Sequence, residues 1–391
     1  MILQGSSGNG ALAGITVLEV ASYVSGPFAG MLLSDLGAEV IKIEPPGEGD
    51  PFRGWGKDEY SATFGSLNRN KKSIAVDLKT EEGRDTLRRL ATRADVLVEN
   101  FRPGKLVRMK LGYEHLRPLN ERLIYCSISG FGAQGPYRDY PGYDTIGQGM
   151  GGLLSLLTER SMPKPMGISL SDHLAGVFAC YGILAALVAR QRTGRGQLVE
   201  TSLMQSTVAF LAENAANFFE GGPPPDRARR THQALVFAFV AADGRPLVIH
   251  LSSPQKFWIG LTRAIGREEL QSDPRFQNRA GRSANYDALD AILCETFRAR
   301  DREQWLSLLR AQDVPCGPLY DLKEVFDDPQ VKFLGLKKEL PHPRRGRVAV
   351  VGSPVQLSDT PAQMSRAAPD LGEDTEEVLR TLLKEASGRK A

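Results

Sequence analysis

The chain has 391 residues, of which 41% are hydrophobic and 24% charged, enough for two or three domains with sizeable cores. Its formal net charge of +3 comes without basic tracts, so nucleic acid is not expected as a partner. The four cysteines are widely scattered, which favours neither a disulfide framework nor a metal site.

Two features of the sequence bear on its location. Residues 1–10 are polar and glycine-rich, unlike a signal peptide. The apolar run at 174–189 is shorter than the ~20 residues that a membrane span needs. We therefore expect a soluble, cytoplasmic protein with no membrane partner.

The first part of the chain predicts alternating strands and helices. A β-branched strand at 15–20 is followed by a helix with Pro27 in its first turn, which ends at Gly37. Further strands are predicted at 39–44, 95–99 and 123–129, with a helix at 81–93. This alternation is typical of a doubly wound α/β domain with a parallel sheet.

The segment 167–172 brings one carboxylate, Asp172, to the start of an apolar helix that we expect from about His173. Because 174–189 carries no charge, this helix is predicted to be buried on all sides. A carboxylate there is held near backbone N–H groups and is suited to attack a carbonyl carbon. Most Asp residues at such positions are only helix N-caps, and spacing alone favours the cap.

The second half of the chain has a different pattern of predicted elements. A Gly- and Pro-rich linker occupies 220–226, and an Asp243-Gly244 turn predicts a hairpin. Amphipathic helices follow, which indicates a smaller α+β domain. The predicted hairpin strands lie at 237–242 and 246–250, the helices at 255–265, 286–298 and 302–312, and the tail adds a hairpin around 344–346 and a helix at 374–386.

Two glycine-rich segments match a dinucleotide-binding fingerprint on paper. The first, at 8–13, precedes the first strand, whereas the motif must follow a strand. The second, at 147–152, follows a turn instead of a hydrophobic strand. We therefore do not expect NAD or FAD.

Several ordered blocks together resemble class III CoA-transferases, such as formyl-CoA transferase, crotonobetainyl-CoA:carnitine CoA-transferase and succinyl-CoA:glutarate CoA-transferase. The acyl-CoA racemases are relatives of this family. The resemblance runs nearly end to end. The blocks lie at 17–19, 25–29, 35–44, 47–50, 68–74, 98–104, 193–197, 314–318 and 371–375.

The resemblance implies an acyl-CoA:carboxylate CoA-transferase with Asp172 as the catalytic residue. In the family, this Asp attacks the donor thioester, giving an aspartyl mixed anhydride and then an aspartyl-CoA thioester. An acyl-CoA donor and a carboxylic acid acceptor are the implied partners, with dicarboxylates such as succinate as candidate acids. Coenzyme A is then a substrate, and neither a tightly bound cofactor nor a metal is expected.

The resemblance also assigns a set of residues to CoA binding. For the segment after 98–99 the alternative is a simple strand-to-helix turn, and for the basic residues it is a solvated charge. A neighbouring basic cluster, Arg69, Lys71 and Lys72, could equally be a solvated turn. The assigned residues are Val24, Ser25, Val76, Asp77, Leu78, Lys79, Asn100, Phe101, Arg102, Arg108, Gly142, Tyr143 and Asp144.

Local departures bear on the type of reaction and on the acid. The racemases have a His where Tyr143 stands, and a phenol with a pKa near 10 is a poorer base at neutral pH, which favours transfer. Val24 and Pro45 replace a Gln and an Arg of formyl-CoA transferase, and its four-glycine run is missing, so oxalate or formate is not expected. Candidate contacts for the acceptor carboxylate, or alternatively mere linker surface, are Arg229, Arg230 and His232.

Family architecture further implies a homodimer whose chains interlock like rings. Residues 1–210 would form the first part of a Rossmann-like large domain, followed by a linker at 211–232 and a small domain at 233–325. Residues 326–391 would form a second linker and the C-terminal return to the large domain. Two other functions stay open: an acyl-CoA racemase or epimerase of the same family, and a non-catalytic CoA-binding protein.

Overall fold

The computed structural model describes residues 10–56 and 60–384, which form two compact units. Of the described residues, unit 1 contains 10–56, 60–154, 165–215 and 333–384. Unit 2 contains residues 155–164 and 216–332. The expected boundaries at 210, 232 and 325 stay predictions.

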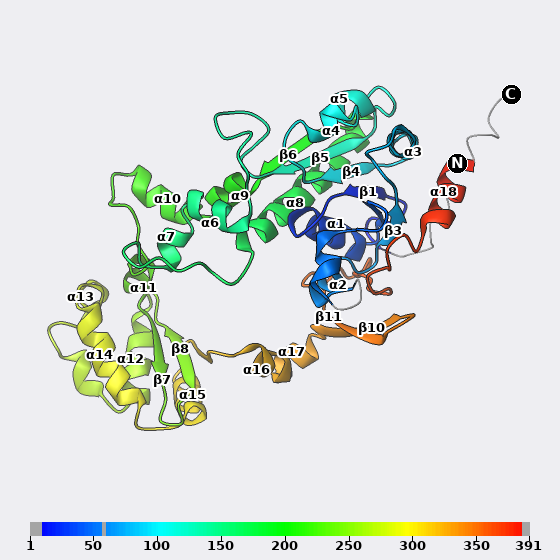
Figure 1. Ribbon diagram of the computed structural model, residues 1–391. Helices are drawn as coiled ribbons and strands as arrows, with labels where there is room; N and C mark the ends of the chain where they lie inside the picture. Colours follow the sequence, from blue (N-terminus) through cyan, green and yellow to red (C-terminus); the bar gives the residue numbers. More distant parts are fainter. Residues whose placement is uncertain (1–9, 57–59, 385–391) are drawn as a thin grey trace. The chain divides into compact units, whose positions relative to one another are not determined.

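Unit 1 is built on a six-stranded parallel sheet with the strand order β3-β2-β1-β4-β5-β6 (Figure 1). The expected α/β class with a parallel sheet is therefore confirmed. Strand order reverses between β1 and β4, so the loops that leave these two strands diverge and open a crevice at the carboxyl end of the sheet. The strands are β1 (Thr16–Val20), β2 (Glu39–Glu44), β3 (Lys72–Ala75), β4 (Val96–Glu99), β5 (Ile124–Ser129) and β6 (Leu198–Ser202).

Helices cover both faces of this sheet. Successive strand residues point to opposite faces, and apolar residues occupy both sets of positions. On one face Val17, Val96 and their neighbours pack against α1 (Ser25–Asp35) and α8 (Leu170–Thr193). On the other face Leu18 and Leu97 share a core with α3 (Glu81–Ala91) and α18 (Thr375–Lys384). Figure 1 shows α18, near the end of the chain, beside β3, where the Asp374 carboxylate accepts a 2.8 Å hydrogen bond from Ser73 N.

Helix α8 differs from its prediction in two ways. It begins at Leu170 instead of near His173, and it is not buried on all sides. Ala175, Ala179 and Ile183 recur at the core, whereas Val177, Tyr181 and Val188 are 46%, 68% and 68% exposed. The reason is that the sheet and its neighbours cover only one side of the helix within a single chain.

The length of α8 also departs from the expected short apolar run. At 24 residues it is long and apolar enough to cross a membrane, by length and composition alone. A core helix of a soluble protein passes the same test, and the buried residues of α8 pack in the core of unit 1.

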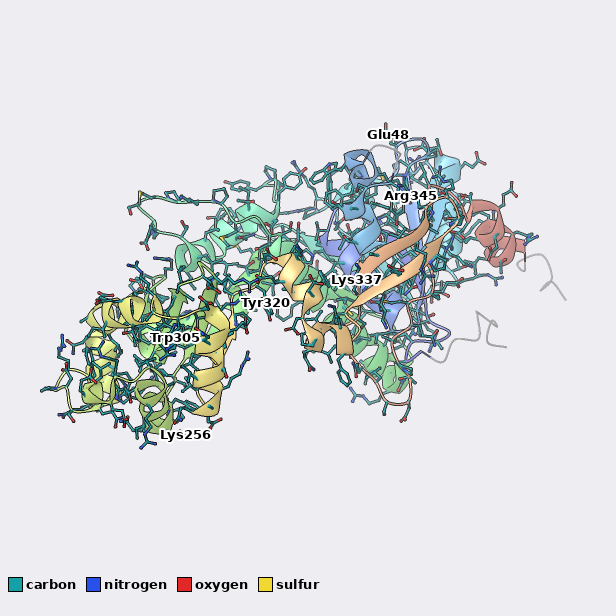
Figure 2. The ribbon with its side chains drawn as sticks, turned by 90° about the horizontal axis from the view of Figure 1, so that it is seen from below. Glu48, Lys256, Trp305, Tyr320, Lys337 and Arg345 are labelled. Carbon is teal, nitrogen blue, oxygen red and sulfur yellow. The ribbon has the colours of Figure 1, made fainter. Side chains whose placement is uncertain are left out.

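Unit 2 contains the predicted hairpin and helices. Strands β7 (Val236–Val240), β8 (Pro246–His250) and β9 (Cys316–Pro318) form an antiparallel sheet. Its core includes Trp258 and Trp305, the second of which is labelled in Figure 2. Trp305 Nε1 donates a 2.8 Å hydrogen bond to Phe297 O. The three predicted helices are α12 (Gln255–Ala264), α14 (Tyr286–Phe297) and α15 (Arg302–Ala311).

The predicted hairpin of the tail is also present, with Lys337 and Arg345 at its opposite ends (Figure 2). Residues 385–386 of the predicted last helix lie outside the described residues. The remaining elements are η1 (Pro51–Trp55), α2 (Ala62–Leu67), α4 (Lys105–Arg108), α5 (Tyr113–Leu116), α6 (Asp144–Met150), α7 (Leu154–Leu157), α9 (Leu203–Phe210), α10 (Ala212–Phe219), α11 (Arg229–Ala234), η2 (Glu268–Gln271), α13 (Arg279–Ala284), α16 (Leu322–Asp327), α17 (Pro329–Phe333), β10 (Lys337–His342) and β11 (Gly346–Val351).

A network of buried ion pairs joins a residue of β1 and a residue of β2 to two residues from the loops nearby. Lys42 Nζ is 2.9 Å from both Glu19 Oε1 and Asp50 Oδ2, and Lys71 Nζ is 2.7 Å from Glu19 Oε2. These four side chains are completely buried. Burial lowers the pKa of Lys71 to about 8, and the Glu19 carboxylate opposes that fall.

The solvated turn considered for the basic cluster at 69–72 is therefore wrong for two of its three residues. Arg69 is buried against Asp35, and Lys71 against Glu19. Lys72 alone is partly exposed, between Glu39 and Glu377. The two buried cations are tolerated because each one meets a carboxylate.

We expect Glu19→Gln to lower the free energy of unfolding by about 3–5 kcal/mol, because Lys71 then loses its carboxylate in a buried site. Urea titration measures the change. The matched control is Asp313→Asn, which breaks the exposed pair with Lys256 and should cost less than about 1 kcal/mol. Equal losses in the two variants would contradict the role assigned to burial.

Candidate active site

Two adjoining pockets lie at the crevice where the strand order reverses. The first, called here the Asp172 pocket, has a volume of about 410 Å³ and is lined by the loops after β1, β4 and β5 and by the start of α8. The second, called the β3 pocket, has a volume of about 290 Å³ and is lined by the loops after β2 and β3. Both include Ser22, Phe101 and Lys105 in their walls, so one extended ligand can occupy both.

The predicted site residues gather at these pockets, with one exception. Asp144 belongs to neither wall. The segment 76–79, assigned to CoA binding by the resemblance, lies directly after the end of β3. The Asp172 pocket includes Val24, Ser25, Asn100, Phe101, Arg102, Arg108, Gly142, Tyr143 and Asp172, and the β3 pocket includes Val76, Asp77, Leu78, Lys79 and again Phe101.

Asp172 is the third residue of α8, and the N-cap position belongs to Ser169. The reading of Asp172 as a helix cap is therefore wrong, because its carboxyl lies inside the first turn and in the pocket wall. Burial raises the pKa of Asp172 to about 7, and the nearby Asp144 carboxylate adds to the rise. Such a carboxyl is poorly solvated and becomes anionic near neutral pH, as a nucleophile toward a carbonyl requires.

Asp144 acts on Asp172 through the backbone. Its Oδ1 accepts a 3.2 Å hydrogen bond from Asp172 N, while its Oδ2 accepts one of 2.6 Å from Gln148 Nε2. Gln148 Nε2 also donates to Ile168 O at 2.8 Å, which ties α6 to the segment that leads into α8. Sequence reasoning missed Gln148, whose only signal was its spacing of four residues from Asp144 on one helix face.

Close packing explains the glycines of the 147–152 segment better than a dinucleotide does. A Cβ at Gly147 would lie 2.9 Å from Leu203 Cβ and 3.1 Å from Ser171 Cβ. Its absence lets α6 lie against the first turn of α8 (Figure 1). A Cβ at Gly176, one turn past Asp172, would similarly lie 2.8 Å from Ser25 O, so α1 and α8 also meet closely beside the pocket.

Asn100 joins the two loops that flank the crevice. Its Oδ1 accepts from Ser22 N at 3.0 Å, and its Nδ2 donates to Ser22 O at 2.7 Å and to Ser25 Oγ at 3.2 Å. These bonds satisfy the side-chain amide of Asn100 within the protein. Asn100 therefore helps to shape the pocket wall by holding Ser22 in place. Glu99 supports the same loop by accepting a 2.8 Å bond from Phe101 N, and burial raises the pKa of this carboxyl to about 7.

Positive charge collects on the segment that follows β4. Arg102, Lys105 and Arg108 line the Asp172 pocket, and Lys79 and Lys105 line the β3 pocket. Lys105 Nζ lies 3.8 Å from the centre of the Phe101 ring. Cations placed around two joined pockets suit an elongated ligand that carries several negative charges.

Other candidate groups are placed as follows. Tyr23, which sequence reasoning missed, lines the Asp172 pocket with a positive φ of 65°, a conformation that the sequence did not signal. Arg229, Arg230 and His232 all lie on α11 in unit 2, and their role stays a prediction. Across residues 10–56 and 60–384, no group of three or more His, Cys, Asp or Glu side chains could hold a metal ion.

Comparison with known proteins defines the class. Residues 12–375 match the model of CoA-transferase family III. Succinyl-CoA:glutarate CoA-transferase of Mus musculus is 38% identical over 383 residues, covering 96% of this chain and 87% of that protein. Succinate–glutarate CoA-transferase of Agrobacterium fabrum is 37% identical over 384 residues, covering 95% of each.

A solved structure agrees with these sequence matches. The CAIB/BAIF family protein from Brucella suis superposes with a TM-score of 0.85 at 37% identity, covering 96% of this chain and 100% of that one. The chain therefore belongs to CoA-transferase family III, and it is an enzyme that transfers CoA. The family resemblance read from the sequence is confirmed at this level.

We expect Asp172→Asn to stabilise the ligand-free protein at pH 8 by on the order of 3 kcal/mol, because a neutral amide replaces a buried carboxylate. The wild-type protein should lose stability as pH rises from about 4 to about 7, where only its folded state holds the Asp172 proton. The difference in the free energy of unfolding between the variant and the wild type should thus approach zero toward pH 4. Urea titrations across this range measure it.

The control for that experiment is Asp139→Asn, at a carboxylate that is 88% exposed in the same unit. Its effect on unfolding should be small at every pH. A difference for Asp172→Asn that does not vary with pH would contradict the raised pKa.

Proposed function

We propose that this enzyme moves CoA from an acyl-CoA donor to a carboxylic acid acceptor through covalent intermediates on Asp172. The observation that carries the proposal is a desolvated carboxyl in the wall of a pocket that adjoins a second, cation-lined pocket. A carboxylate is a weak nucleophile toward a thioester in water, but holding it beside the carbonyl carbon without its hydration shell makes it competent.

The proposed chemistry has four balanced steps. Asp172 attacks the donor thioester carbonyl, which forms an aspartyl mixed anhydride and expels CoA as a thiolate. The thiolate attacks the aspartyl carbonyl, forming the aspartyl-CoA thioester and releasing the donor acid. The acceptor carboxylate then attacks the aspartyl carbonyl of this thioester, which expels the CoA thiolate and forms a second mixed anhydride. Finally the thiolate attacks the acyl carbon of the acceptor, so that the new acyl-CoA leaves and the Asp172 carboxylate is restored.

In this proposal the CoA moiety occupies both pockets. The cations at 102–108 and Lys79 face its phosphates, and the apolar walls around Val76 and Leu78 receive its less polar parts. CoA enters and leaves as a substrate, so no tightly bound cofactor is needed. Dicarboxylates such as succinate are the proposed acids, supported by the names of the two relatives above.

We further propose that two chains form an interlocked homodimer. The support is the apolar stripe of α8, formed by Val177, Tyr181 and Val188, which a single chain leaves exposed. Exposed apolar patches of this kind mark interfaces more often than free surface. On the same reading α8 is an interface helix and not a membrane span. We also propose that unit 1 is a Rossmann-like domain, which the strand order of its parallel sheet supports, and that the enzyme acts in the cytoplasm.

We expect wild-type enzyme incubated with succinyl-CoA to carry a CoA adduct on Asp172. Hydroxylamine converts a thioester there to a hydroxamate, and borohydride reduces it, so peptide mass spectrometry locates the adduct. Exchange between succinyl-CoA or acetyl-CoA and a panel of dicarboxylates and hydroxy acids should follow ping-pong kinetics. Asp172→Asn should bind CoA yet lose turnover by a factor of roughly 10³ or more.

Three results would speak against this scheme. An unmodified Asp172 together with an active Asp172→Ala variant would remove the covalent route. Solvent deuterium at the α-carbon of the acyl group, without any acceptor acid, would favour a racemase. Tight CoA binding with no product from the whole panel would favour a non-catalytic binding protein.

The dimer is tested by charge insertion. We expect Val188→Glu to shift the molar mass measured by light scattering from dimer toward monomer, because the new carboxylate would have to be buried in the interface. The matched control is Leu119→Glu, at an exposed leucine outside α8, which should leave the dimer intact. A wild-type monomer, or dissociation in both variants, would contradict the proposed interface.

A further inference from the structure

Tyr23 holds a backbone conformation that a tyrosine rarely adopts. Its φ of 65° places it in the left-handed region, directly in the loop between β1 and α1. Such strain persists only where the surroundings hold the residue in place, and it concentrates at functional sites. Here Tyr23 N donates a 3.3 Å hydrogen bond to Asp50 Oδ1, and Asp50 is in turn fixed by the buried Lys42.

The Tyr23 ring is held as firmly as its backbone. Its centre lies 5.5 Å from that of Phe52 and 6.1 Å from that of Tyr143, with interplanar angles of 87° and 89°. Phe52 itself is buried and packs edge-on against Trp55 at 4.6 Å. Tyr23 therefore packs between Phe52 and Tyr143 in the wall of the Asp172 pocket.

The rings of Tyr23 and Tyr143 lie next to each other in the pocket wall, with their centres 6.1 Å apart. Burial and the neighbouring Tyr143 raise the pKa of Tyr23, so its hydroxyl stays protonated at neutral pH. A phenol hydroxyl both donates and accepts, so two neighbouring phenols can share one hydrogen bond and still offer one O–H to a ligand. Tyr143 is 64% exposed, so a ligand in the pocket can reach it.

A neutral donor suits this part of the pocket. Among the described residues, the cations of the pocket wall are Arg102, Lys105 and Arg108, all on the segment after β4. A cation on the tyrosine side would pair with the Asp172 carboxylate and weaken it as a nucleophile. A phenolic hydrogen bond can hold an acid oxygen without that competition.

We propose that Tyr23 is a binding residue for the acid substrate. Acting with Tyr143, it supplies the phenolic hydrogen bond to an oxygen of the carboxylic acid that is held against Asp172. This inference rests on the proposed function, since it assigns the acid end of the substrate to the tyrosine side of the pocket.

The test compares Tyr23→Phe, Tyr143→Phe and the double variant in CoA exchange with succinyl-CoA and an acceptor acid. Tyr23→Phe keeps both ring contacts and should raise the KM for the acid roughly three- to tenfold, the range of one neutral hydrogen bond. The inhibition constant of free CoA should change less than about twofold. Because the phenols act as one donor, the double variant should be no worse than the poorer single variant.

Two controls separate binding from folding. Tyr137→Phe removes a hydroxyl from a nearby tyrosine that does not line the pocket, and its KM values should match the wild type. Tyr23→Gly accepts a positive φ without strain and lacks the phenol, so it should show the same rise in the KM for the acid.

An unchanged KM for the acid in Tyr23→Phe, a parallel rise in the CoA inhibition constant, or additive losses in the double variant would each overturn the inference. The wild-type enzyme is assayed alongside. If it transfers no CoA, the proposed function fails, whereas normal wild-type transfer with an unaffected Tyr23→Phe variant removes only the role of Tyr23.

Discussion

The structure of the site depends on the burial of two lysine ammonium groups around one carboxylate. Glu19, on β1, forms ion pairs with both Lys42 and Lys71. Lys42 Nζ also donates to Ala21 O and Lys71 Nζ to Pro27 O, each at 2.8 Å. These two carbonyls bracket the loop between β1 and α1, so the buried charges fix both ends of the loop that lines the Asp172 pocket.

The reversal of strand order turns this rigid loop into part of a site. The loops after β1 and β4 leave neighbouring strands in opposite directions, and Asn100 bonds them together through Ser22. The crevice between them is the natural ligand position in an open parallel sheet. Cations gather on the segment after β4, whereas the phenols of Tyr23 and Tyr143 lie in the loops after β1 and β5, so the two ends of an acyl-CoA would meet different chemistry.

Helix α8 serves the site and the surface at once. Its first turn carries Asp172, and the core residues that follow anchor it against the sheet. Asp144 accepts hydrogen bonds from Asp172 N and from Gln148 Nε2, which holds the backbone at the entry to the helix beside the pocket. The opposite stripe, with Tyr181 and Val188, is apolar yet uncovered in one chain, which connects the position of Asp172, the proposed nucleophile, to the proposed dimer.

The amino-acid sequence by itself determined the alternation of strands and helices, because burial on both sheet faces leaves period and composition signals in nearby residues. It also indicated the family through ordered blocks, and the resemblance to that family predicts Asp172 as the catalytic residue. Only the tertiary structure decided that Asp172 lies inside the first helical turn, that Lys71 is buried, and that Tyr23 faces Tyr143. Those features depend on contacts between residues far apart in the chain. Local sequence patterns do not predict such contacts.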